Sequence, residues 1–96
     1  MTDIASISKL LAIAEKAIEV DTLKTDHTEN LRKLKGSYDR YKKKHGIVDR
    51  VDTSDEEWDR MKVATALEYQ DVEKSRRAVY NSERRLATAI RKYRHG

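Results

Sequence analysis

The stretch 45–58, HGIVDRVDTSDEEW, separates two long segments with helical periodicity and therefore decides the fold. Gly46 can take the left-handed conformation that closes a helix, so the first segment is expected to end there. Thr53 or Ser54, each followed three residues later by a glutamate, forms a capping box that begins a second helix. The stretch thus predicts a helix end, a turn over residues 45–54 and a new helix start.

The segment before this turn carries a seam in which spacings of three and four residues alternate without a slip. Such a seam predicts one long helix over about residues 3–44. Weak helix formers gather at 21–27, and a break there would fold the segment into two helices of a three-helix bundle. The unbroken spacing favours a continuous helix. The seam residues are Leu10, Ile13, Ala17, Val20, Lys24, His27, Leu31, Leu34, Tyr38, Tyr41 and His45.

The segment after the turn has the same spacing and predicts a second helix over about residues 55–94. Trp58 at its start is expected to pack on Ile47, Val48 and Val51 and to hold the turn closed. Several seam residues are small, which permits a neighbouring helix to approach closely. The seam residues are Trp58, Met61, Thr65, Glu68, Val72, Ser75, Val79, Ser82, Leu86, Ala89 and Tyr93.

Two long helices joined by a short turn are expected to pack as antiparallel neighbours. The predicted fold is therefore all-α: a coiled-coil-like antiparallel helical hairpin, with the three-helix bundle as its alternative. At 96 residues the chain is expected to form a single domain, residues 1–96.

The composition and the absence of known motifs argue against catalysis and metal binding. There is no cysteine, and no histidine pair has the spacing of a metal site. The acidic turn lacks the alternating aspartates of a calcium loop. No glycine-rich loop or nucleophile motif is present. We therefore expect no catalytic residue, metal, cofactor or small-molecule substrate, and hence no enzyme.

The beginning of the chain has neither the basic start of a signal peptide nor an uninterrupted apolar run. Lys9, Glu15 and Lys16 interrupt its apolar residues. We therefore expect no membrane partner and a cytoplasmic location.

The predicted function is binding, because the first helix has more apolar surface than one neighbour can cover. Ile4, Ile7, Leu11, Ala14 and Ile18 form a second row beside the seam. Exposed aliphatic rows of this size usually mark an interface. The chain is thus predicted to be an assembly module, adaptor or small regulator that self-associates or binds a protein. Tyr69 and Tyr80, on one flank of the second helix, are further candidate protein contacts.

The alternative function is nucleic-acid binding by a basic face of the second helix. Its arginines recur at seven-residue spacing and could follow a phosphate backbone. The net charge of +4 is too small to decide this. The candidate residues are Lys74, Arg77, Arg84, Arg85, Arg91 and Lys92.

In size, a hairpin with one central tryptophan resembles the W-x-G hairpin proteins. Trp58 is followed by Asp59 and Arg60, however, so the defining motif is absent. The size and charge also suit small phage-encoded proteins that bind one host or virion component.

Overall fold

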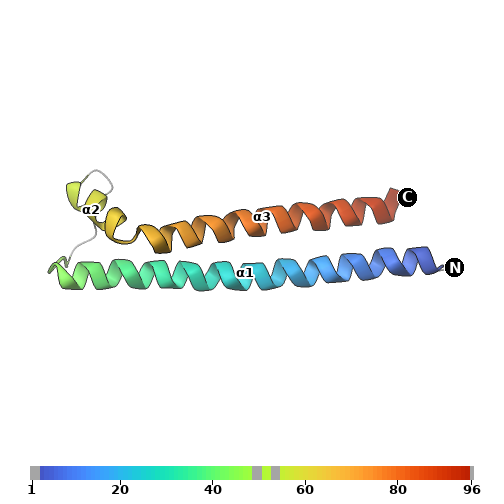
Figure 1. Ribbon diagram of the computed structural model, residues 1–96, viewed down its shortest axis with the longest axis horizontal. Helices are drawn as coiled ribbons and strands as arrows, with labels where there is room; N and C mark the ends of the chain where they lie inside the picture. The colour runs from blue at the N-terminus through green and yellow to red at the C-terminus, as the bar shows by residue number, and fades with distance from the viewer. Residues whose placement is uncertain (1–2, 49–50, 53–54, 96) are drawn as a thin grey trace.

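The computed structural model describes residues 3–48, 51–52 and 55–95, and it is an antiparallel helical hairpin (Figure 1). Helix α1 spans Ile4–Lys44, α2 spans Glu56–Ala64 and α3 spans Ala66–His95. Helices α1 and α3 lie side by side along most of their length, so that the two ends of the chain meet at one end of the molecule. The described part measures 67 × 20 × 19 Å, which confirms the predicted hairpin.

Helix α1 is continuous through residues 21–27, so the three-helix alternative is wrong. The helix begins at Asp3, whose side-chain Oδ1 accepts a 2.7 Å hydrogen bond from the backbone N–H of Ser6. Within the weak segment, the hydroxyl of Thr25 donates to the carbonyl oxygen of Asp21, a bond that a helix accommodates. The half-buried Leu23 and His27 continue the contact with α3 across this segment, and packing thus outweighs its low propensity.

The predicted α1 seam is correct at only one of its two alternating sets of positions. Ile13, Val20, His27, Leu34 and Tyr41 are buried or half-buried. In the other set only Tyr38 is half-buried. At its remaining positions the seam residue is exposed, and residues one position earlier take part in the contact instead. Exposed are Leu10, Ala17, Lys24, Leu31 and His45, whereas Lys9, Lys16, Leu23, Asn30 and Ser37 are buried or half-buried. The apolar arc of α1 is so wide that it does not fix the rotation of the helix by itself.

The predicted seam on the second half of the chain is confirmed except at its end. Met61, Thr65, Val72 and Ser82 are buried, with 1–4% of their surface exposed. The other seam positions are half-buried, and Tyr93 is 40% exposed. Small side chains at buried positions let the two helices approach closely. Among the described residues the buried apolar side chains are Val20, Leu34, Met61 and Val72, so the core is slight.

The second half of the chain was predicted to form one continuous helix, but this helix is interrupted at Thr65. There the backbone has φ −111° and ψ 19°, outside the helical range. The Thr65 hydroxyl donates to the carbonyl oxygen of Met61 at 2.8 Å, and such a bond to the preceding turn bends helices. As a result α2 leaves the line of α3 at the turn end of the hairpin (Figure 1).

The end of α1 follows the prediction. Gly46 has φ +67° and closes the helix, while Ile47 N–H donates to the carbonyl oxygen of Lys42 at 2.8 Å. The capping residues Thr53 and Ser54 lie outside the described residues. Val48 is 96% exposed, so the expected packing of Trp58 on it is wrong. Trp58 instead lies against Tyr38, with ring centroids 6.0 Å apart.

Candidate functional site

The two halves of the hairpin differ in packing. Every buried residue that the structure describes lies between Val20 and Ser82, in the half that contains the turn. The other half, residues 3–19 of α1 against residues 83–95 of α3, contains half-buried and exposed side chains only. We call it the open half. Exposed apolar and charged side chains gather in the open half, so it is the strongest candidate for a binding surface.

The predicted second row of α1 is exposed along the open half. We call Ile4, Ile7, Leu11, Ala14 and Ile18 the outer row. Its four large side chains are 83%, 47%, 60% and 67% exposed, in chain order. At 100° per residue, the outer row is centred about 180° from the residues that face α3. The structure therefore places these residues together on a face that no described residue covers, while their role in binding stays a prediction.

The two predicted tyrosine contacts do not form a joint surface with the outer row. Tyr69 and Tyr80 are 47% and 62% exposed on α3, about 16 Å apart along its axis. Tyr69 borders a small apolar depression at the bend, together with Val63. The Arg84 guanidinium lies over the Tyr80 ring, 5.7 Å from its centroid.

The predicted basic face of α3 divides into separate parts. Lys74 and Arg77 border a shallow depression of about 530 Å³ together with Glu73. Glu73 also pairs with Arg76 at 2.5 Å, so this part carries a carboxylate among its cations.

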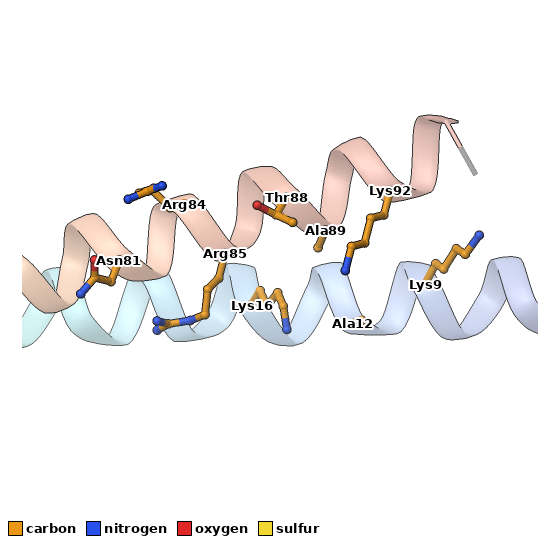
Figure 2. Close-up of a pocket in the computed structure, with 9 residues that line it drawn as sticks. All are labelled: Lys9, Ala12, Lys16, Asn81, Arg84, Arg85, Thr88, Ala89 and Lys92. Carbon is orange, nitrogen blue, oxygen red and sulfur yellow. The ribbon is translucent and has the colours of Figure 1, made fainter.

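The remaining predicted cations of α3 lie in the open half. Arg84, Arg85 and Lys92 border a groove of about 640 Å³ between the two helices (Figure 2). Arg91 and Lys92 border a second depression of about 500 Å³, near the end of α3. Lys92 thus belongs to both.

Two further residues of the groove were missed by the sequence analysis. Lys9 and Lys16 of α1 line it opposite the α3 cations, although they counted there only as interruptions of an apolar stretch. Their seven-residue spacing was a signal, because it places both on one side of a helix. The register of the hairpin, which decides what they face, could not be obtained from that spacing.

Polar contacts across the seam join α1 to α2 and α3. His27 Nδ1 lies 2.6 Å from Ser75 Oγ, and the Ser75 hydroxyl is also 3.0 Å from the carbonyl oxygen of Val72. The Tyr41 hydroxyl donates to Glu57 Oε1 at 2.8 Å. Burial, and then this bond to Glu57, raises the pKa of Tyr41 above its usual value. These groups satisfy one another across the helix contact, which is a structural role.

Neither a metal centre nor a membrane span emerges from the part of the chain that the structure describes. Over residues 3–48, 51–52 and 55–95, no three histidine, aspartate or glutamate side chains come together as metal ligands. Within the same residues, no helix combines the length and apolar character needed to cross a bilayer. The surfaces that remain for a function are the outer row and the groove.

No protein-family model, curated protein or solved structure matches this chain, so its function must be argued from these surfaces.

Proposed function

We propose that this chain is a non-enzymatic protein-binding and assembly module that self-associates through the outer row. The observation that carries the proposal is the exposure of Ile4, Ile7, Leu11 and Ile18 on one face, opposite the contact with α3. A two-helix hairpin with four buried apolar side chains among its described residues has little core to stabilise it. Covering the outer row would add the apolar burial that the hairpin lacks.

The spacing of the outer row suits a second helix of the same kind. Its residues follow one another at intervals of three, four, three and four, the pattern of a coiled-coil contact. The row extends equally to both sides of Leu11, so two copies can pair antiparallel with Leu11 opposite Leu11. Ile4 of one copy then faces Ile18 of the other. The contact covers 15 residues, or roughly 22 Å of helix.

Charge does not oppose this contact. The positions that border the row on one side are Leu10 and Ala17, which widen the apolar surface. On the other side stand Ser8 and Glu15, and antiparallel pairing brings Glu15 of one copy near Ser8 of the other. The lysines of this helix segment, Lys9 and Lys16, face the groove instead. Within residues 4–18, like charges are therefore kept apart, as a self-complementary interface requires.

Light scattering coupled to size exclusion tests the proposal over a range of concentrations. The decisive variant is Ile7→Ser with Leu11→Ser, which places two hydroxyls in the centre of the row. The control is Val63→Ser with Leu67→Ser, two residues that are 78% and 74% exposed at the other end of the hairpin. We expect the wild type and the control to be dimers and the outer-row variant to be a monomer with unchanged helical circular dichroism. A wild type that stays monomeric at every concentration, or an outer-row variant that still dimerises, overturns the proposal.

A further inference from the structure

The groove of the open half collects positive charge from both long helices. Lys92 extends toward the opposite helix, and Arg85 crosses the gap between the ribbons (Figure 2). The part of the wall between the cations consists of small side chains, which leave the groove open along its length. The residues that line the groove are Lys9, Ala12, Lys16, Asn81, Arg84, Arg85, Thr88, Ala89 and Lys92.

The charges of the groove are only partly neutralised. Arg85 pairs with Glu19 at 2.5 Å, and both side chains are about half exposed. Lys16 and Lys92 make no ion pair with any residue that the structure describes. Over the open half, residues 3–19 and 83–95, seven lysines and arginines stand against four aspartates and glutamates. The net charge of the whole chain is +4, so the open half, at +3, accounts for most of its basic character.

The cations repeat along both walls. Lys9 and Lys16 are seven residues apart on α1, and Arg85 and Lys92 are seven apart on α3. Seven residues correspond to about 10 Å along a helix. A ligand that matches this arrangement carries negative charges repeated along its length rather than at one point. Phosphate groups of a nucleic-acid strand have that property, and both arginine and lysine bind them.

The guanidinium of Arg84 lies on the side of α3 that is turned away from α1 (Figure 2). Tyr80 is 62% exposed and lies under that guanidinium, so the pair offers a stacking surface beside the groove rather than inside it. Proteins that bind single strands combine a cationic channel for the backbone with aromatic and arginine planes on which bases stack. This pair distinguishes a nucleic-acid strand from an acidic peptide, which has no flat bases to place on it.

From these observations we propose that the groove between α1 and α3 binds single-stranded nucleic acid. The phosphates lie along Lys16, Arg85 and Lys92, and a base that extends out of the groove over α3 stacks at the Tyr80–Arg84 pair. This site uses other residues than the outer row, so it is independent of the proposed self-association. It keeps three of the six cations predicted on the second helix and adds the α1 wall.

Fluorescence polarisation with a labelled single-stranded oligonucleotide tests this site. The groove variant Lys16→Ala with Lys92→Ala is compared with Lys74→Ala plus Arg77→Ala, which removes the same charge outside the groove. With about three phosphate contacts, the affinity of the wild type should fall roughly 20-fold between 50 and 200 mM salt. The groove variant should lose about 1.4 from the slope of log affinity against log salt, because two contacts are gone. The control should keep the wild-type slope.

A gain-of-function variant separates a specific groove from general attraction. Glu19→Gln removes the carboxylate that pairs with Arg85, so the affinity for the oligonucleotide should rise several-fold. Glu15→Gln changes the net charge equally, but Glu15 does not line the groove, and it should have little effect. Equal tightening by both variants overturns the proposal. The proposal is also overturned if both alanine pairs lose the same salt slope, or if the wild type does not bind the oligonucleotide at 50 mM salt. It is overturned as well if polyglutamate of the same charge competes as well as unlabelled oligonucleotide does.

Discussion

His27 Nδ1 of α1 lies 2.6 Å from Ser75 Oγ of α3, near the middle of the hairpin. On the next turn, Asn30 Nδ2 donates to the carbonyl oxygen of Asp71 at 3.3 Å. Sliding α3 by three or four residues along α1 would place His27 against Val72 or Val79 and leave its nitrogen without this partner. Polar groups at a seam are known to specify register in this way. The register in turn decides that Lys16 lines the same groove as Arg85 and Lys92.

Removing one member of the His27–Ser75 pair should cost more than removing both. Ser75→Ala leaves a half-buried ring nitrogen without its partner and should lower the free energy of unfolding by about 1 kcal/mol. The double change His27→Leu with Ser75→Ala replaces both groups by apolar ones and should be neutral or stabilising. Urea denaturation of the single and double variants, at one fixed protein concentration, measures the coupling. Strictly additive changes would show that the pair does not act as a unit.

The short helix α2 offers a matched test of the core. Met61 is 2% exposed, and Met61→Ala should lower the free energy of unfolding by roughly 2–5 kcal/mol, because it leaves a cavity at the bend. Val63, two residues away and 78% exposed, is the control. Val63→Ala should change the free energy by no more than about 0.5 kcal/mol. Thermal or urea unfolding followed by circular dichroism compares them, and similar losses in both would contradict the packing of α2 described here.

The sequence predicted where the helices lie better than it predicted which of their residues pack together. The C-terminal end of α1 followed from local chemistry, because Gly46 can take the conformation that closes a helix and the three lysines in the last turn stabilise its negative end. The α3 seam followed from a narrow apolar stripe that admits one rotation. The α1 seam did not, since its apolar residues cover a wide arc and Leu10 is as apolar as Ile13. Which side is buried is decided by the partner.

The bend at Thr65 and the groove could not be predicted from the sequence, because both depend on how the helices pack. Thr65 carries no proline or glycine signal, and a threonine hydroxyl bonds the preceding turn only in some surroundings. The outer row was visible as a row, because helical periodicity alone places its residues together. The groove needed the register between α1 and α3, and that register depends on pairs such as His27 and Ser75, which lie 48 residues apart.

The start of α1 should depend on pH through Asp3. The hydrogen bond from the backbone N–H of Ser6 holds the pKa of Asp3 below its ordinary value of about 3.9. The charged cap therefore stabilises the first turn fully above that ordinary value and is lost as pH falls through the lowered pKa. We expect the amide protection of Ser6 to decrease over this acidic range in hydrogen-exchange NMR. Asp3→Asn keeps an acceptor that does not titrate, so its first turn should show no such step. The same step in this variant would assign it to another group.

The two described glycines, Gly36 and Gly46, should respond to alanine with opposite signs. Gly36 lies inside α1, and a Cβ there would meet only the end of the Arg40 side chain, at 3.4 Å. Gly36→Ala should raise the free energy of unfolding by about 0.5–1 kcal/mol, since alanine loses less backbone entropy in a helix. Gly46 has open space around it but a φ of +67°, which strains any residue with a Cβ. Gly46→Ala should therefore lower the free energy by about 1–2 kcal/mol, and Gly46→Asn by less. Urea midpoints that move in the same direction for both alanine variants would show that helix α1 does not end at Gly46.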